Sequence, residues 1–150
     1  MKIIYIKGDL LEATESYILH GCNAQGVMGS GVAKAIREKW PKAYEDYYDM
    51  FKGPHKLPMG FMINSLQPDG KIIINAITQN HYGRVANMIY VDYEMIRKVM
   101  RDINEGTKTP NLIRVAMPRI GAGLGGGDWN LISKIIEEES TNFQPIVYEL

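Results

Sequence analysis

The sequence predicts one α/β domain over residues 1–150, a three-layer α/β/α sandwich around a mixed central sheet of about six strands. Runs of β-branched and aromatic residues alternate with helical patterns along the chain. The turn Pro68-Asp69-Gly70 joins two apolar runs, so it predicts a hairpin and some antiparallel pairing in an otherwise parallel sheet. We find no repeat, linker or low-complexity tract that would divide the chain.

The N-terminal part predicts two strands and then two helices. Met1–Lys7 and Tyr17–Cys22 are rich in strand-forming residues. Gly31–Trp40 has apolar residues at helical spacing, and Pro41 ends that pattern. Proline suits the first turn of a helix, where its missing N–H is not needed, so we expect a second helix over Lys42–Met50.

The rest of the chain predicts four more strands and two more helices. The longer of these helices has apolar residues recurring every three or four positions. In chain order the expected elements are the strands Gly60–Leu66 and Lys71–Thr78, a helix from about Met88 to Asn104, the strand Ile113–Met117, the helix Asn130–Glu139 and the strand Gln144–Leu150.

Composition excludes several classes of protein. Seventeen basic and seventeen acidic residues cancel, so no whole-protein field draws the chain to nucleic acid or to a membrane. Cys22 is the single cysteine, which rules out an internal disulfide and fits a reducing compartment. The apolar start is too short for a signal peptide, and no run approaches the roughly 20 residues that span a bilayer. We expect a cytoplasmic monomer.

A glycine-rich loop precedes the last predicted helix. Five glycines fall within Gly121–Gly127, between the strand ending at Met117 and the helix starting near Asn130. Glycine adopts positive φ at little cost, so backbone N–H groups can converge on an anion there. The helix start adds unpaired N–H groups and the positive end of a dipole. A glycine loop alone is equally compatible with a tight turn.

A second glycine-rich loop, within His20–Ala33, also runs from a strand into a helix start. Two such loops at the carboxyl ends of strands predict a diphosphate held between them. Asp9 follows the first strand in Gly8-Asp9-Leu10. Its carboxylate either accepts a hydrogen bond from an exocyclic amine such as adenine N6, or caps a helical turn at Leu10.

These motifs resemble the macrodomain family, whose members bind ADP-ribose. The resemblance covers essentially the whole chain and rests on Lys7-Gly8-Asp9-Leu10, the His20–Ala33 loop and the Pro118–Trp129 loop, in the family's order. The chain looks closest to a branch of ADP-ribose-1″-phosphate phosphatases, terminal ADP-ribose protein glycohydrolases and DNA-directed ADP-ribosyl glycohydrolases. The resemblance implies ADP-ribose, or its 1″-phosphate, as ligand and ADP-ribosylated DNA or protein as further partners.

The resemblance also implies a set of ligand-binding residues. Asp9 and Leu10 would contact adenine, with Tyr148 or Leu150 flanking it unless Tyr148 is an ordinary strand aromatic. Asn23 matches an asparagine near the distal ribose. The implied diphosphate and ribose contacts are Gly29, Ser30, Gly31, Val32, Thr78, Gln79, Gly121, Ala122, Gly123, Leu124 and Gly125. No cofactor is expected, and three dispersed histidines with one cysteine do not make a metal site.

Three departures from the family bear on the chemistry. Glycohydrolases of this branch carry a lysine where Gln79 stands, and Gln cannot form a Schiff base or bring a charge. The protein-directed enzymes carry an aspartate where this chain has Gly125. Many mono-ADP-ribosyl hydrolases carry an aspartate where Ala33 stands. The phosphatase pattern fits better, because its branch has a histidine at the position of His20.

His20 and Asp128 are the candidate catalytic residues. An imidazole titrates near neutrality, so His20 could take a proton from an attacking water or give one to a leaving oxygen. The alternative is a buried histidine satisfied by backbone. Asp128 could supply a carboxylate, or it could cap the last helix just before Trp129.

Three functions are therefore open. The first is hydrolysis of ADP-ribose 1″-phosphate with water activated by His20. The second is a glycohydrolase acting on ADP-ribosylated DNA or protein. Its nucleic-acid contacts would come from basic residues that could equally form a solvated helix face, namely Lys34, Arg37, Lys39 and Lys42. The third is a reader that binds ADP-ribose without turnover.

Overall fold

A six-stranded mixed sheet forms the middle layer of the molecule, as the sequence predicts. The computed structural model describes residues 1–53, 57–81 and 88–150. The strand order is β1-β6-β5-β2-β4-β3, with the β3–β4 pair antiparallel and every other neighbouring pair parallel. The strands are β1 (Ile4–Lys7), β2 (Tyr17–Asn23), β3 (Met62–Leu66), β4 (Ile72–Gln79), β5 (Ile113–Met117) and β6 (Phe143–Glu149).

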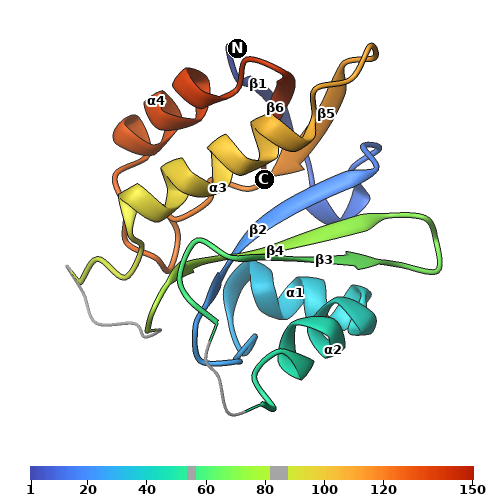
Figure 1. Cartoon of the computed structure of the whole chain (residues 1–150), viewed down its shortest axis with the longest axis vertical. Coiled ribbons are helices and arrows are strands. Elements are labelled where there is room, and N and C mark those ends of the chain that lie inside the picture. The colour runs from blue at the N-terminus through green and yellow to red at the C-terminus, as the bar shows by residue number, and fades with distance from the viewer. Residues whose placement is uncertain (54–56, 82–87) are drawn as a thin grey trace.

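Helices cover both faces of this sheet, which confirms the three-layer prediction. Figure 1 shows α1 and α2 on one side of the sheet and α3 and α4 on the other. Among the described residues, no helix is long and apolar enough to cross a membrane. The helices are the short 3₁₀ turn η1 (Leu10–Glu12), α1 (Gly31–Lys39), α2 (Pro41–Asp49), α3 (Tyr93–Gly106) and α4 (Trp129–Glu139).

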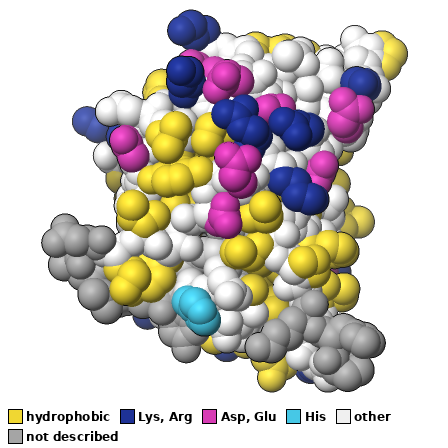
Figure 2. Space-filling view, turned by 60° about the vertical axis from the view of Figure 1, so that its left-hand side comes forward, with side chains coloured by type: hydrophobic (Ala, Val, Ile, Leu, Met, Phe, Trp, Pro, Cys, Tyr) yellow, Lys and Arg dark blue, Asp and Glu magenta, His cyan; other side chains and the backbone are white. Residues whose placement is uncertain are grey.

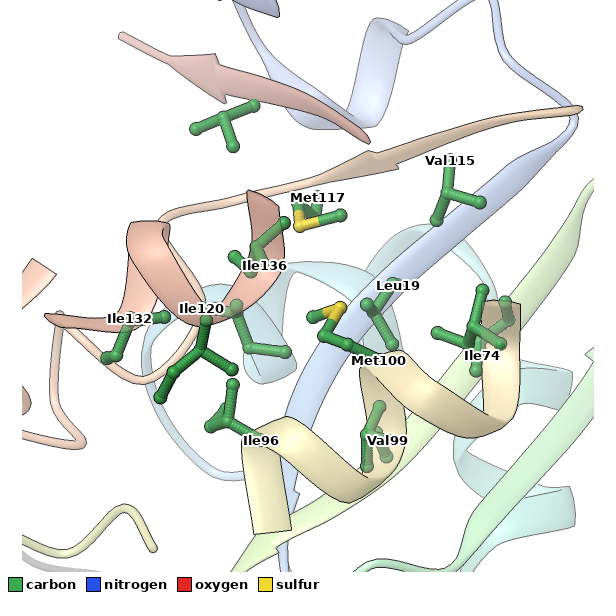
Figure 3. Close-up of a cluster of buried hydrophobic side chains, with 14 of the residues drawn as sticks. Leu19, Ile74, Ile96, Val99, Met100, Val115, Met117, Ile120, Ile132 and Ile136 are labelled. Carbon is green, nitrogen blue, oxygen red and sulfur yellow. The ribbon is translucent and has the colours of Figure 1, made fainter. Parts of the chain in front are cut away.

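Alternation along β2 gives each face of the sheet its own core. Leu19 is fully buried in the large cluster beneath α3 and α4, where Figure 3 shows it near Met100 and Ile74. Ile18, one residue earlier, is fully buried on the α1 side with Ile36. Successive strand side chains point to opposite faces, so a strand covered on both sides carries apolar residues at consecutive positions, as at Ile18 and Leu19. Full burial of each such side chain contributes about 1.5–3 kcal/mol.

The start of α3 differs from the sequence prediction. The apolar pattern predicts a helix from about Met88, but α3 begins at Tyr93. Asp92 is the N-cap, and its carboxylate accepts hydrogen bonds from the N–H groups of Glu94 and Met95. Val91 instead bridges to Gln79 of β4, so the chain stays extended up to the cap. The other ends differ by a few residues at most.

The carboxyl ends of β2 and β5 separate, and this opens a crevice. The two strands are paired at Tyr17 with Val115 and at Ile18 with Ala116. Beyond these pairs β2 continues against β4, while β5 continues against β6. The chain then leaves β2 for α1 on one face and leaves β5 for α4 on the other. Ligands of open α/β sheets bind at such a switch point.

Candidate functional site

A continuous cleft lies at the carboxyl ends of β2 and β5. It has two parts, an inner hollow of about 380 Å³ and an outer hollow of about 700 Å³. They join along a shared wall formed by Gly31, Val32, Pro118, Arg119 and Gly123. This combined size is typical of a site for a small organic ligand.

The structure brings together all but one of the residues predicted for the site. Asp9, Leu10 and Ala122 line the outer hollow. The exception is Asp128, which is absent from the lining of either hollow. The predicted residues lining the inner hollow are His20, Asn23, Gly29, Ser30, Gly31, Val32, Thr78, Gln79, Gly121, Gly123, Leu124 and Gly125.

Asn23 and Tyr47 hold the loop after β2 in shape. The side-chain oxygen of Asn23 accepts hydrogen bonds from the N–H groups of Gln25 and Val27, at 2.9 and 3.3 Å, and its amide donates to the Val27 carbonyl. The buried Tyr47 hydroxyl donates to the Asn23 carbonyl at 2.6 Å and accepts from the Gly26 N–H. Sequence reasoning missed Tyr47. Its spacing from Ala43 on one helix face indicates burial but not this contact.

The N-terminus of α1 faces the inner hollow without a cap. Ser30 occupies the N-cap position, yet its hydroxyl makes no capping hydrogen bond, and the first turn carries no acidic residue. Ser30, Gly31, Val32 and Ala33 all line the inner hollow. The first-turn N–H groups of a helix have no partner within it, and they carry the positive end of its dipole. This end of α1 is therefore suited to an anion.

The second glycine loop is fixed by its own backbone and by the segment before α3. The Gly121 carbonyl accepts from the Gly127 N–H at 2.8 Å. The Gly125 carbonyl accepts from the N–H groups of Tyr90 and Val91, at 2.8 and 3.1 Å. A Cβ at Gly125 would lie 2.7 Å from the Gly121 carbonyl oxygen, so the loop excludes a side chain there. The aspartate that some macrodomain hydrolases carry at this position has no room in this chain.

Several N–H groups of this loop have no acceptor in the part of the chain that the structure describes. Those of Gly123, Leu124 and Gly125 donate to no described residue, and all three residues line the inner hollow. Backbone N–H groups that converge from two loops can bind phosphate oxygens without a cation.

His20 lies buried in the floor of the inner hollow, with 1% of its surface exposed. Its Nε2 lies 2.5 Å from Asn75 Oδ1, and the Asn75 amide donates to the Ala43 carbonyl. Because Asn75 presents its oxygen, Nε2 carries the proton and Nδ1 is the acceptor. Burial lowers the pKa of His20 to about 4, against the smaller opposing effect of the Asn75 hydrogen bond. The expected backbone partner is therefore replaced by a side chain, and the imidazole is neutral at physiological pH.

Thr78 and Gln79 complete the floor at the end of β4. Thr78 Oγ1 is buried and has no hydrogen-bond partner among the described residues. The neighbouring Gly21 lacks a side chain, and a Cβ there would lie 2.7 Å from that oxygen. Gln79 donates from its amide to the His81 carbonyl at 2.7 Å. The Thr78 hydroxyl is thus the floor's unused polar group, because a buried hydroxyl ordinarily has a partner.

Asp9 and Asp128 both cap helices. Asp9 Oδ1 accepts from the Leu11 N–H at 2.9 Å, which confirms the capping alternative, and Asp9 also lines the outer hollow. Asp128 Oδ1 accepts from the Asn130 N–H at 2.9 Å at the start of α4. This contact confirms the capping alternative for Asp128, which lines neither of the two hollows.

The charge distribution favours an anion in the cleft rather than a nucleic-acid track beside it. Among the described residues, the lining of the inner hollow includes no Asp, Glu or Lys, and Arg119 is its charged member. Of the expected basic stripe on α1 and α2, Arg37 stacks on Tyr44 and two lysines pair with Glu12 and Asp46. Basic and acidic side chains also lie interleaved on the face shown in Figure 2.

The described residues contain no cluster of three or more potential metal ligands.

Comparison with known proteins agrees with this geometry. Residues 19–136 match the Macro domain family. The DNA ADP-ribosyl glycohydrolase of Mycobacterium tuberculosis is 33% identical over 131 residues, covering 85% of this chain and 35% of that protein, so this chain spans about a third of its length. The ADP-ribose 1″-phosphate phosphatase of Candida albicans is 32% identical over 148 residues, covering 91% of this chain and 92% of that protein.

A solved structure shows the same architecture. The macrodomain of M. tuberculosis DarG has a TM-score of 0.80 at 27% identity, covering 99% of this chain and 97% of that one. The resemblance and the macrodomain-like fold predicted from the sequence are confirmed.

The burial of His20 predicts a pH-dependent stability. Folded His20 titrates near 4 and the unfolded residue near 6.5, so the unfolded chain binds more protons between these values. Stability from this residue is complete above pH 6.5 and is lost as the pH falls to 4, by about 3 kcal/mol. When urea unfolding is measured across this pH range, the free energy of unfolding of His20→Gln should lack the part of its pH dependence that comes from His20. His81→Gln, at an exposed site, should keep it. An unchanged slope in His20→Gln would contradict the buried neutral histidine.

The packing of the second loop predicts different costs for two neighbouring glycines. Gly125→Ala should lower the free energy of unfolding by about 1–3 kcal/mol, because its Cβ overlaps the Gly121 carbonyl. Gly123→Ala is the matched control, since a Cβ there meets nothing within 4 Å. It should change stability by about 0.5 kcal/mol or less. Equal effects in chemical denaturation would show that the loop is looser than its contacts imply.

Proposed function

We propose that this chain, which belongs to the Macro domain family, binds ADP-ribose and hydrolyses ADP-ribose 1″-phosphate to ADP-ribose and inorganic phosphate. The observation that carries the proposal is the pair of glycine loops lining one cleft, each with N–H groups that have no acceptor among the described residues. A diphosphate needs several convergent donors, and two loops supply them from opposite sides.

The two hollows match the two ends of ADP-ribose. Adenosine fits the outer hollow, where Asp9 caps η1 through Oδ1 and leaves Oδ2 for the ligand, and where Leu10 and Tyr148 provide apolar walls. The diphosphate then lies at the shared wall between the loops. The distal ribose occupies the inner hollow above Thr78, whose unpaired hydroxyl supports a hydrogen bond to a sugar hydroxyl.

The electrostatics of the inner hollow favour a phosphate at C1″. A phosphate monoester carries up to two negative charges, and this lining offers N–H donors, the start of α1 and no carboxylate. Cleavage of a glycosidic bond passes through a cation-like sugar that carboxylates stabilise. That carboxylate support is missing here. Gln79 and Gly125 stand where the glycohydrolases carry a charged group, and Gly125 has no room for one.

In the proposed reaction, water attacks phosphorus and the bond between phosphorus and the C1″ oxygen breaks. Neutral His20 accepts the proton from water at Nδ1 and returns it to the leaving oxygen, so ADP-ribose and inorganic phosphate are released. A pKa of about 4 makes free His20 a weak base. The substrate phosphate opposes this, because a nearby anion stabilises the imidazolium and raises its pKa.

A glycohydrolase is the second candidate, favoured by the similarity to the M. tuberculosis DNA ADP-ribosyl glycohydrolase. This reaction would have to cleave the bond at C1″ without the lysine and the aspartate that those enzymes carry where this chain has Gln79 and Gly125. A reader without turnover is the third. Both become outcomes of the activity test below.

Location and assembly stay predictions, and we propose a cytoplasmic monomer. Cys22 is a free, buried cysteine with 3% exposure. Burial raises the pKa of its thiol, so it is poorly placed to react with a second copy.

The activity is tested with purified protein and ADP-ribose 1″-phosphate. Wild type should release phosphate, and His20→Ala should do so about 100-fold more slowly or worse, because a general base is lost. ADP-ribose binding by calorimetry checks that the variant folds, and His81→Ala is the control. Phosphate release no faster than in His20→Ala would rule out the proposed reaction. Release of ADP-ribose from ADP-ribosylated DNA would select the glycohydrolase, and binding without turnover the reader.

A further inference from the structure

Arg119 stands at the junction of the two hollows. It follows Pro118 at the end of β5 and lines both the inner and the outer hollow. Its guanidinium lies 5.6 Å from the centre of the Trp129 ring, and the Trp129 indole N–H donates to the Tyr5 hydroxyl at 3.1 Å. Arg119 is thus placed over the wall where the two glycine loops approach each other, with an aromatic ring to orient it.

Arg119 forms an exposed ion pair with Glu149, which another anion can replace. Nε and Nη2 contact the same oxygen of Glu149, Oε2, at 2.9 and 2.6 Å. This is weaker than a fork on both carboxylate oxygens. The side chains are 49% and 36% exposed, and exposed pairs contribute little to stability. Nη1 contacts no acceptor among the described residues, so part of the guanidinium stays available.

We propose that Arg119 is the specificity-determining residue for the diphosphate, and that Glu149 is an internal anion whose place the ligand's phosphates take. The inference rests on the proposed ADP-ribose cleft and names the part of the ligand that the cleft selects. A diphosphate brings two charges and several acceptor oxygens to the free edge of the guanidinium. An uncharged nucleoside brings neither, so it gains nothing from Arg119.

Glu149 gives this arrangement its selectivity. In the free protein its carboxylate neutralises Arg119 where both side chains line the outer hollow. A weakly charged ligand must therefore compete with an existing partner, whereas a diphosphate replaces it with a stronger one. The pair between Arg101 and Glu139, on α3 and α4, has similar chemistry and lines neither the inner nor the outer hollow. It provides a matched control.

The test measures the affinity of ADP-ribose, inorganic pyrophosphate and adenosine for five proteins by calorimetry. Arg119→Gln should weaken ADP-ribose and pyrophosphate by about 10- to 100-fold and adenosine by about twofold or less. Arg119→Lys should fall between, because it keeps the charge and loses the fork. Glu149→Gln should strengthen ADP-ribose by about two- to fivefold. Arg101→Gln should match wild type for every ligand.

Two results would overturn the inference. One is an equal loss of adenosine and ADP-ribose in Arg119→Gln, which would make Arg119 a packing residue of the outer hollow. The other is weaker ADP-ribose binding in Glu149→Gln, which would make Glu149 a positioning residue instead of a competitor. If wild type binds pyrophosphate through Arg119 but not ADP-ribose, the proposed function fails while the role of Arg119 stands.

Discussion

The cleft depends on where the pairing between β2 and β5 stops. The two strands share the pairs Tyr17–Val115 and Ile18–Ala116 and then part, each continuing along its other neighbour. Their following helices cover opposite faces of the sheet, so neither α1 nor α4 closes the gap between the strand ends. Both glycine loops start from these ends. His20 and Thr78, near the ends of β2 and β4, therefore line the inner hollow.

In the proposed complex, backbone N–H groups bind the diphosphate, and side chains mainly hold that backbone in shape. Tyr47 and Asn23 hold the first loop, and the Gly125 carbonyl ties the second loop to the segment before α3. In both loops, residues that line the cleft keep N–H groups with no acceptor among the described residues. The same packing explains the missing carboxylate, because Gly125 has a backbone oxygen where a Cβ would stand. Phosphate chemistry is therefore favoured by the shape of the loop itself.

Local sequence signals predicted the layers, the mixed sheet and most of the cleft, because each depends on patterns within a few residues. The predicted start of α3 was wrong. The apolar helical spacing that includes Ile89 is overridden by the Asp92 cap and by the pairing of Val91 with Gln79. The contacts of Asn75, Tyr47 and Arg119 were missed because each joins residues distant in the chain: Asn75 lies 55 positions from His20, and Arg119 lies 30 from Glu149. The sequence around Asp128 was compatible with a helix cap and with a catalytic carboxylate, and its contact with the Asn130 N–H shows the cap.

Binding of the diphosphate by N–H groups of both glycine loops can be followed through the backbone amide signals of ¹⁵N-labelled protein while ADP-ribose is added. We expect the largest shifts at Val32 and Ala33 in α1 and at Gly123, Leu124 and Gly125 in the second loop, with hydrogen exchange at these amides slowed in the complex. Shifts confined to the outer hollow around Asp9, with these five amides unchanged, would contradict it.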